Sequence, residues 1–359
     1  MRIMVQKYGG SSVSDIPSIQ HVASRIVKAV DEGWHVVVVV SAMGNTTNEL
    51  LRLARQVSPE PKRRELDLLI SVGERVSMTL LAMAVQHLGY KAQSFTGSQS
   101  GIITNDQHAA ARIIEVRPDR IQRALNEGYV AIVAGFQGMS LSKEVTTLGR
   151  GGSDASAVAL AAALKAEFCE ICSDVDGVYS ADPRRVAAAY RHDEIDIDTV
   201  LTASQRGAKV LQAEALLLAQ KLGIKLRANA TALPSGQGTL ITPHTQNTAV
   251  MVAVEQQVVW VKGCASELLH QYASHILYAS SEAVLIRSAN LHGHLPKEAN
   301  TDVVLLTMLS ESNVFQGLEW LQENSTVYGW WYSDRGLSVI LESENVDYLQ
   351  SRVHELLVS

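Results

Sequence analysis

The sequence predicts an α/β protein built on a mostly parallel sheet that helices cover on both faces. From Met1 to about Thr242, short apolar segments alternate with stretches of helical period, which is the pattern of strands joined through helices. A run of five valines, Val36–Val40, is typical of a strand buried in a parallel sheet. Strands are expected at Ile3–Tyr8, Val36–Val40, Ala92–Phe95, Val130–Ala134, Glu167–Ser173 and Ile224–Ala228. In such a sheet, ligands bind at the carboxyl ends of the strands.

The first helix shows its period most clearly. Its apolar residues recur at helical spacing, at Ile16, Ile19, Val22, Ala23, Ile26, Val27 and Val30. Asp15 is suited to cap the helix, Pro17 fits its first turn, and Gly33 is suited to end it.

The composition changes beyond residues 242–249, which have the character of a linker. The later part holds four of the five tryptophans and is predicted to form two successive units of strand, helix, strand and strand. These cover about 258–287 and 303–341, and a final helix covers about 346–357. We therefore expect an α/β domain over residues 1–245 and a smaller α+β region over residues 246–359. The second region shows no convergent cluster of titratable residues, which favours regulation or dimerisation over chemistry.

Composition excludes several classes of protein. The chain has 359 residues, of which 47% are hydrophobic and 19% charged, as in ordinary globular proteins. A net charge of −6 argues against a nucleic-acid-binding surface. The valine run is too short to span a membrane, and Met1 leads almost directly into a strand without a secretory signal, so no membrane partner is expected. Three cysteines, Cys169, Cys172 and Cys264, favour a reducing cytoplasm over a disulfide framework.

No metal site is predicted from the cysteines or histidines. Cys169 and Cys172 lie three apart on an expected strand, so their thiols point to opposite faces and are interpreted as core residues. No second C-x-x-C completes a zinc site. His292 and His294 have no further ligand nearby in sequence and are interpreted as part of a solvated loop.

The segment "VQKYGGSSV" suggests an anion site directly after the first strand. Lys7 supplies a cation, Gly9 and Gly10 allow close backbone approach, and Ser11 and Ser12 offer hydroxyls. Phosphate is the usual ligand of such a loop. On this segment alone, a glycine turn with a solvent-facing lysine explains the residues slightly better.

A second glycine-rich segment, "TLGRGGSDASAVALAAALKAE", leads into an alanine-rich helix that is expected to begin at Ser153 or Asp154. A helix start offers unpaired N–H groups and a positive dipole end, and Arg150 can grip a carboxylate or phosphate with two hydrogen bonds. The alternative is a loop with an ordinary Ser or Asp cap, which leaves Arg150 between glycines unexplained.

Further polar residues follow the later strands. Ser173 and Asp174 end the fifth strand, although "DG" and "DP" in "CSDVDGVYSADPRRV" also indicate a plain turn. Tyr179, Arg184 and Lys209 are suited to an adenine ring and phosphates. Glu74 lies in the first turn of a helix that "SVGERVS" opens, where interaction with the helix dipole alone would explain it. The segment "VSAMGNTTN" begins at the end of a buried strand and continues with small polar residues, which is typical of a turn or of a substrate-binding loop.

Eight motifs in order give the chain a specific resemblance. They are "KYGGSSV", "SAMGNTTN", "SVGERVS", "GIITNDQHAAARI", "VAGFQG", "TLGRGGSDASA", "SDVDGVYSADPR" and "GAKVL". Each is weak alone, but the set resembles the aspartate kinase family over roughly residues 1–241. The resemblance implies an amino-acid-kinase fold, magnesium-ATP as phosphoryl donor, L-aspartate as acceptor and 4-phospho-L-aspartate as product. It also implies that the C-terminal region is a tandem of ACT-like modules.

The resemblance also implies roles for individual residues. Lys7 and Asp154 match the catalytic pair. The expected aspartate site comprises Thr47, Glu74, Arg150, Gly151, Gly152 and Ser153. The expected nucleotide site comprises Lys7, Tyr8, Gly9, Gly10, Ser41, Ser173, Asp174, Tyr179, Arg184, Lys209 and Val210. Magnesium is expected to bind through the nucleotide, without a dedicated set of protein ligands.

The expected chemistry explains why no histidine-centred constellation appears. An aspartate side chain, with a pKa of about 3.9, is already ionised at neutral pH and needs no general base. Catalysis then reduces to positioning and to neutralising charge on the transferring phosphoryl group. Two alternatives remain: a sister kinase of the same fold acting on another carboxylate such as acetylglutamate, and a catalytically idle amino-acid sensor.

Several residues depart from the family pattern. Ser11 and Ser173 replace threonines, Gln212 and Ala213 replace a His-Pro pair after "GAKVL", and an arginine and a phenylalanine common near residues 226–241 are missing. The C-terminal region is short for tandem ACT-type domains and lacks their usual effector motif. We therefore expect a homodimer formed through this region, weakly inhibited or not inhibited by lysine or threonine, with Trp320, Trp330 and Trp331 available for a hydrophobic interface or for core packing.

Overall fold

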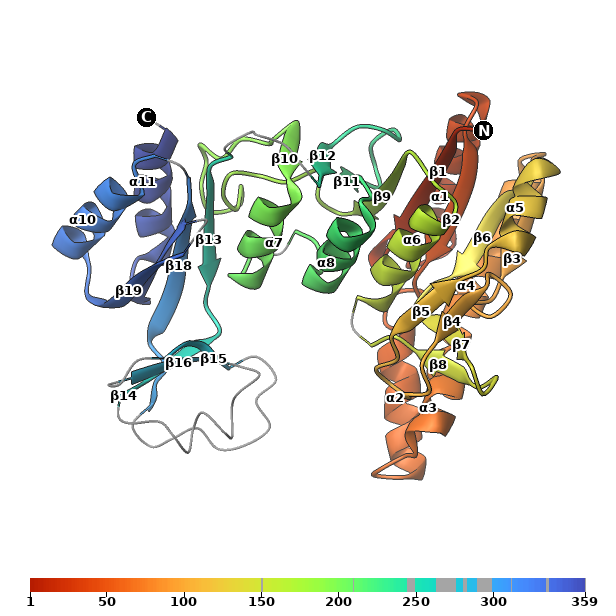
Figure 1. The fold of residues 1–359 in the computed structure, drawn as a ribbon, viewed down its shortest axis with the longest axis horizontal. Helices are drawn as coiled ribbons and strands as arrows, with labels where there is room; N and C mark the ends of the chain where they lie inside the picture. The colour runs from red at the N-terminus through yellow and green to blue at the C-terminus, as the bar shows by residue number, and fades with distance from the viewer. Residues whose placement is uncertain are drawn as a thin grey trace. The chain divides into compact units, whose positions relative to one another are not determined.

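The computed structural model describes residues 1–149, 151–208, 210–243, 249–262, 276–279, 283–288, 299–310, 312–333 and 336–358. The chain divides into two compact units (Figure 1). Unit 1 contains residues 1–178, 193–197 and 210–245, and unit 2 contains residues 179–192, 198–209 and 246–359. Each unit is described separately below. The expected domain boundary near residue 245 stays a prediction.

Unit 1 is built on an eight-stranded sheet in the order β10-β12-β11-β9-β1-β2-β6-β3. Neighbouring strands run parallel, except that β11 and β12 are antiparallel. The strands are β1 (Ile3–Tyr8), β2 (His35–Val40), β3 (Ala92–Phe95), β6 (Val130–Ala134), β9 (Phe168–Ser173), β10 (Glu194–Asp196), β11 (Leu226–Ala230) and β12 (Thr239–Thr242). The predicted fold class is confirmed. The six expected strands all form, although the last begins and ends two residues later than expected.

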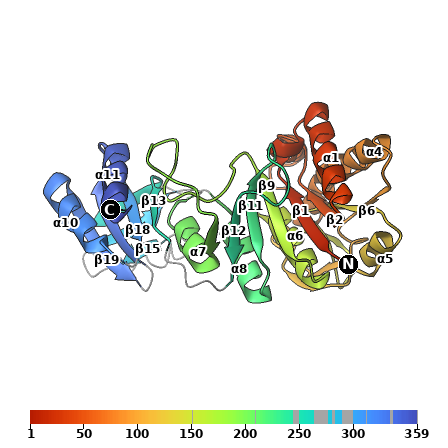
Figure 2. The same ribbon diagram turned by 90° about the horizontal axis from the view of Figure 1, so that it is seen from above.

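Helices cover both faces of this sheet. Figure 2 shows α1 (Ile16–Asp31) and α4 (Val72–His87) on one face, and α6 (Gly152–Ala163) and α8 (Ala213–Leu222) on the other. The helix α5 (Asp119–Asn126) packs beside β6. As expected, Asp15 caps α1 by accepting a hydrogen bond from the Ser18 N–H at 2.8 Å, and Gly33 follows the end of α1 with a positive φ of 86°.

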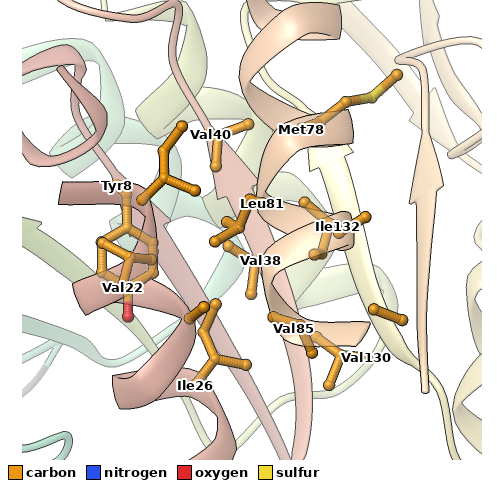
Figure 3. Packing of buried hydrophobic residues seen from close by; sticks show 14 of the residues in the cluster. Tyr8, Val22, Ile26, Val38, Val40, Met78, Leu81, Val85, Val130 and Ile132 are labelled. Carbon is orange, nitrogen blue, oxygen red and sulfur yellow. The ribbon is translucent and has the colours of Figure 1, made fainter. Parts of the chain in front are cut away.

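The main core lies between the sheet and the pair α1 and α4. Figure 3 shows Val22 and Ile26 of α1 facing Leu81 and Val85 of α4 across Val38 of β2. All five side chains are fully shielded from solvent. The buried valine strand predicted from the sequence therefore forms the centre of this core.

A smaller four-stranded sheet completes unit 1, in the order β5-β4-β7-β8. Its strands are β4 (Ile102–Thr104), β5 (Ile113–Val116), β7 (Gln137–Ser140) and β8 (Val145–Thr147). A short helix η1 (Gly10–Val13) follows β1, and α2 (Thr46–Val57) and α3 (Arg63–Ile70) precede α4. The sequence analysis did not predict this sheet.

One stretch of the described chain, Arg63–His87, is long and apolar enough to cross a membrane by length and composition alone. It consists of α3 and α4, with Ser71 between them. Half of its apolar window is buried inside the protein. Met78, Leu81 and Val85 of α4 belong to the main core, so packing in the core accounts for the apolar character of this stretch.

Unit 2 contains two antiparallel four-stranded sheets. The first has the order β13-β18-β20-β19 and comprises β13 (Met251–Glu255), β18 (Val303–Leu309), β19 (Val327–Ser333) and β20 (Gly336–Glu342). The helices α10 (Val314–Asn324) and α11 (Val346–Val358) pack their apolar residues against it. The predicted strand, helix, strand and strand over about 303–341 and the final helix are confirmed. The strand β13, which joins this sheet, was not predicted.

The second sheet of unit 2 has the order β15-β16-β14-β17. It comprises β14 (Val258–Lys262), β15 (Ile276–Ala279), β16 (Ala283–Arg287) and β17 (Ala299–Asn300). The helix expected between its first two strands falls outside the described residues, as do Cys264, His292, His294 and most of the expected linker. The helix α7 (Ile197–Gln205) belongs to unit 2 apart from its first residue.

The tryptophans of unit 2 differ in their surroundings. Trp331 stacks on Tyr278 with ring centroids 4.7 Å apart, and Trp320 packs on the cluster formed by the first sheet and its helices. Trp330, in contrast, is 44% exposed on β19, and the neighbouring Tyr332 is also exposed. Core packing therefore accounts for Trp320 and Trp331 but not for Trp330.

Candidate active site

The polar segments singled out in the sequence meet at one edge of the main sheet. The strands β9, β1, β2 and β6 are adjacent and parallel, so their carboxyl ends lie along the same edge. These ends are Ser173, Tyr8, Val40 and Ala134. The glycine loop after β1 and the small polar residues after β2 and β9 are consequently neighbours. This is the edge at which parallel α/β sheets bind ligands.

An ion pair between Lys7 and Asp154 lies at the centre of this edge. The Lys7 Nζ is 2.7 Å from the Asp154 Oδ1, and the two side chains are only 13% and 8% exposed. Lys7 comes from the end of β1 and Asp154 from the first turn of α6, so two segments far apart in sequence meet here. The interpretation of Lys7 as a solvent-facing lysine is therefore wrong.

Of the two glycines after Lys7, Gly10 is required by its surroundings and Gly9 lies beside the lysine amine. A Cβ at Gly10 would lie 2.9 Å from the Ala42 carbonyl oxygen, a distance that real side chains do not tolerate. A Cβ at Gly9 would lie 3.5 Å from the Lys7 Nζ, which places the lysine amine beside the glycine backbone. The loop thus combines a bare backbone with an adjacent cation, which are the features of an anion site.

The start of α6 is also built from glycine. Gly151 is the N-cap residue and has a left-handed conformation with φ 69°, and no side chain caps the helix. The alternative of an ordinary Ser or Asp cap is therefore wrong. Ser153 instead packs against Gly135, where a Cβ would lie 2.9 Å from its Oγ. The Gly152 N–H donates to the Gly149 carbonyl at 3.1 Å, and the dipole of α6 favours a negative ligand near the start of the helix.

Glu74 is a buried carboxylate near the loop after β2. It is 3% exposed, and its Oε1 accepts a hydrogen bond from the Ala42 N–H at 3.1 Å. Its Oε2 is buried and has no hydrogen-bond partner among the described residues. Burial raises the pKa of Glu74 from 4.5 to about 7. A helix-dipole role alone does not account for a carboxylate so far removed from solvent.

Three further predicted residues lie at or just after the ends of β2 and β9 or in the helix that follows β2. Ser41 donates its backbone N–H to the Tyr8 carbonyl, and Thr47 is half-buried in the first turn of α2. Ser173, at the end of β9, accepts a hydrogen bond from the Val175 N–H through its side-chain oxygen at 3.1 Å. Their roles in the expected nucleotide and aspartate sites stay predictions from the resemblance.

Tyr8 is a predicted nucleotide-site residue whose side chain has a different environment. It is fully buried, and its hydroxyl accepts a hydrogen bond from the Arg25 guanidinium at 2.6 Å. Burial raises the pKa of Tyr8 well above its usual value. The side chain of Tyr8 is therefore part of the core, and its carbonyl already accepts the Ser41 N–H.

Six predicted residues remain: five from the expected nucleotide site, and Arg150 from the expected aspartate site. Asp174 and Val210 belong to unit 1, whereas Tyr179 and Arg184 belong to unit 2. Arg150 and Lys209 fall outside the described residues. The roles of all six stay predictions from the resemblance.

Three residues join the picture of this region: Gly135 and Asp67, which were not singled out from the sequence, and Gln212, which was noted only as a departure from the family pattern. Gly135 provides room for Ser153, as described above. Gln212 lies against Gly151, since a Cβ there would be 3.1 Å from the Gln212 Cβ. Asp67, in α3, is completely buried and accepts several hydrogen bonds. The motif "GFQG" was a signal for Gly135, but nothing in the sequence marked Asp67.

A hollow of about 390 Å³ lies elsewhere in unit 1. Its lining includes Arg2, Trp34, Phe168 and Arg227, which lie near the beginnings of their strands or just before them. No predicted site residue lines it. The topology and the Lys7–Asp154 pair, rather than this hollow, therefore locate the candidate site.

Comparison with known proteins agrees with this geometry. Residues 2–227 match the amino acid kinase family. The crystal structure of aspartate kinase from Synechocystis superposes with a TM-score of 0.61 at 32% identity, covering 99% of this chain and 70% of that one. The chain belongs to the aspartate kinases of the amino acid kinase family. The resemblance seen in the motifs is confirmed.

Curated relatives of this aspartate kinase family member carry the same family name. Aspartokinase from Geobacillus stearothermophilus is 48% identical over 267 residues, which are 74% of this chain and 63% of that protein. Aspartokinase from Mycolicibacterium smegmatis is 53% identical over 232 residues, which are 64% of this chain and 55% of that protein. The chain thus spans less than two thirds of the length of these relatives.

The fold extends along the whole chain of this family member. Escherichia coli aspartokinase III, crystallised in complex with aspartate and ADP, matches with a TM-score of 0.80 at 23% identity, and each chain is covered completely. At this identity the likeness establishes the fold of both the α/β part and the C-terminal part.

Proposed function

We propose that this protein is an aspartate kinase, which transfers the γ-phosphoryl group of ATP to the side-chain carboxylate of L-aspartate. The observation that carries the proposal is the shielded Lys7–Asp154 pair beside the glycine backbone of residues 9 and 10. The names of the relatives support the assignment, and one structural neighbour was crystallised with aspartate and ADP.

The reaction requires positioning and charge neutralisation rather than proton transfer. A carboxylate oxygen of aspartate attacks the γ-phosphorus, a new P–O bond forms, and the bond to the β-phosphate oxygen breaks as ADP leaves. The acceptor is already ionised at neutral pH, so no base is needed. The Lys7 ammonium stabilises negative charge on the transferring group, and Asp154 holds that ammonium in place.

The acceptor site is proposed to lie between the start of α6 and the start of α4. Glu74 pairs with the ammonium group of aspartate, through the carboxylate oxygen that has no partner among the described residues. Arg150 binds a carboxylate of the acceptor, and Thr47, Gly151, Gly152 and Ser153 complete the site. An acetylated substrate such as acetylglutamate lacks the ammonium charge, which disfavours the sister-kinase alternative.

The nucleotide is proposed to bind along the same edge. Gly9, Gly10 and Lys7 contact the phosphates, and the further contacts in unit 1 are Tyr8, Ser41, Ser173, Asp174 and Val210. For Tyr179, Arg184 and Lys209, which belong to unit 2, a nucleotide role is proposed from the resemblance alone. Magnesium enters with ATP and would be held mainly by phosphate oxygens and water, as is usual for this ion. In the described part of the chain, no three His, Cys, Asp or Glu side chains gather as a metal site.

A coupled assay of ADP release with a panel of carboxylates tests the proposal. We expect turnover with L-aspartate and none with N-acetylglutamate. Activity on N-acetylglutamate alone would establish the sister kinase. A folded protein that is inert toward every acceptor, but binds an amino acid by calorimetry, would establish a sensor.

The rest of the chain is proposed to serve assembly. The domains proposed are a kinase domain over 1–245 and an ACT-like region over 246–359, which forms a homodimer in the cytoplasm. The exposed Trp330 and Tyr332 on the outer strand β19 offer an apolar surface for such a contact. Sedimentation of the wild-type protein and of a Trp330→Ser, Tyr332→Ser variant tests the dimer. An unchanged dimer in the variant would remove β19 from the interface.

A further inference from the structure

A buried carboxylate in α3 holds together two segments that lead into the candidate acceptor site. Asp67 is fully shielded from solvent. Its Oδ2 lies 2.7 Å from the His108 Nδ1, and its Oδ1 accepts a hydrogen bond from the Thr147 hydroxyl at 2.6 Å. The Ala109 N–H donates to both carboxylate oxygens at 3.1 Å. Both oxygens are therefore used, by donors from two separate segments.

The first of these segments is the loop of residues 105–111 between β4 and β5. Within it, Ala109 has a positive φ of 67°, a conformation that is unfavourable for a residue with a side chain. Such a conformation persists only where its surroundings fix it. The paired hydrogen bonds from the Ala109 N–H to Asp67 provide that constraint.

The second segment is the end of β8, which runs directly into the glycines before α6. Thr147 donates its hydroxyl to Asp67, and its carbonyl accepts a hydrogen bond from the Ala111 N–H at 2.9 Å. Two residues later, a Cβ at Gly149 would lie 3.5 Å from the Ala109 carbonyl. The approach to Gly151 and Ser153 is thus supported by the loop that Asp67 holds.

Asp67 is connected to the other side of the acceptor site through its own backbone. Its carbonyl accepts a hydrogen bond from the Ser71 N–H at 3.1 Å, and the Ser71 carbonyl accepts one from the Gln137 side chain at 2.9 Å. Ser71 is the junction between α3 and α4, and Glu74 follows in the first turn of α4. One residue is therefore linked both to the proposed ammonium-binding carboxylate and to the proposed carboxylate-binding loop.

We propose that Asp67 is a positioning residue for the amino-acid acceptor, acting through Thr147 and Ala109 on one side and through Ser71 on the other. It touches no substrate. Its loss changes the spacing between Glu74 and the start of α6, and leaves the glycine loop after β1, where the phosphates are proposed to bind, in place. This inference rests on the proposed function for its substrate.

Steady-state kinetics of four variants test the proposal. Asp67→Asn replaces one acceptor oxygen by a donor, and Thr147→Val removes a single hydrogen bond. Both are expected to raise the KM for aspartate about 10-fold or more, which is the effect expected from loss of one hydrogen bond to a charged group. The KM for ATP is expected to stay within about 2-fold of the wild-type value. Thr147→Ser keeps the hydroxyl and is expected to behave as wild type. Thr104→Val is the matched control, because it breaks a buried hydroxyl pair with Thr146 in the same small sheet without touching Asp67.

Hydrogen–deuterium exchange provides a readout that does not depend on activity. Peptides covering 105–111 and 147–153 are expected to exchange faster in Asp67→Asn and Thr147→Val, and at the wild-type rate in Thr104→Val. Exchange at the wild-type rate in both segments of Asp67→Asn would overturn the proposal. So would a KM for aspartate and a KM for ATP that rise equally in Asp67→Asn, or that rise as much in Thr104→Val as in Asp67→Asn. If the wild-type protein does not turn over aspartate, the proposed function fails, and the role of Asp67 in holding the two segments is decided by the exchange data.

Discussion

Gln212 lies directly against Gly151, the residue that begins α6. A Cβ at Gly151 would be 3.1 Å from the Gln212 Cβ and 3.2 Å from its Cγ, and the backbone there has a positive φ of 69°. Gln212 occupies a position at which the aspartate kinase pattern usually has histidine. The contact therefore places this departure beside the proposed acceptor site rather than at a remote position.

Gly151→Ala is expected to weaken aspartate binding and to destabilise the protein. The left-handed backbone costs about 1 to 2 kcal/mol for a residue with a Cβ, and the contact with Gln212 adds to it. Thermal unfolding and the KM for aspartate measure the two effects. Gly223→Ala is the matched control, since Gly223 has a φ of 67° but no atom within 4 Å of the new Cβ. If both variants change the KM for aspartate equally, the contact between Gly151 and Gln212 does not contribute to aspartate binding.

Lys7→Ala is expected to lower kcat by about 10²-fold or more, which is the scale for losing one preorganised donor to developing charge. ATP binding should weaken less, because the glycine backbone remains. Lys28→Ala, at an exposed position of α1, is the control for removing a lysine. Because loss of Lys7 leaves the shielded Asp154 without its ion-pair partner, the variant is expected to be less stable. The kcat is therefore compared after correction for the fraction of protein that is folded. A near-normal kcat would remove Lys7 from the catalytic machinery.

The KM for aspartate is expected to depend on pH through Glu74. Burial holds the pKa of Glu74 at about 7, so the carboxylate becomes protonated below that pH and no longer pairs with an ammonium group. The KM for aspartate should then rise about 10-fold for each pH unit below 7. In Glu74→Gln the KM should be high at every pH. The KM for ATP, measured over pH 6 to 8, is the reference. Parallel changes in both KM values would contradict the placement of Glu74 at the ammonium group.

The same group makes a prediction about stability. The folded-state pKa of Glu74, about 7, is higher than its ordinary value of 4.5, so the folded protein retains a proton that the unfolded chain releases between these values. The free energy of unfolding therefore falls as pH rises from about 4.5 to 7. In the absence of aspartate, Glu74→Gln should be more stable than wild type at pH 8, by up to about 3 kcal/mol, and the difference should shrink toward pH 5. Urea unfolding at the two pH values measures it, with the exposed Glu65→Gln as control. A constant difference would show that Glu74 is not the group that titrates.

Control by end products is expected to be weak. The sequence of the C-terminal region lacks the usual effector motif, although the strands and helix expected over about 303–341 and the final helix form. Initial rates at subsaturating aspartate should therefore change little on addition of millimolar lysine or threonine. Strong cooperative inhibition by either amino acid would show that unit 2 still binds an effector.

The sequence by itself determined the fold class, six of the eight strands of the main sheet and the family. These follow from local patterns: the valine run, the helical period after Asp15, and short motifs whose order is readable along the chain. The identity of Lys7 and Asp154 as candidate partners also came from motifs. Their separation of 2.7 Å did not, because it depends on how β1 and α6 pack.

Only the tertiary structure decided which polar residues are shielded and which backbone positions cannot hold a side chain. The raised pKa of Glu74 results from burial by segments that are far apart in sequence. The contact of Gly151 with Gln212 and the hydrogen bonds of Asp67 likewise join distant segments. The small sheet and β13 were missed for a related reason: their strands are short or pair with distant partners, so their local pattern is weak. Burial and hydrogen bonding between distant segments are properties of the packed chain, and no local pattern of residues reports them.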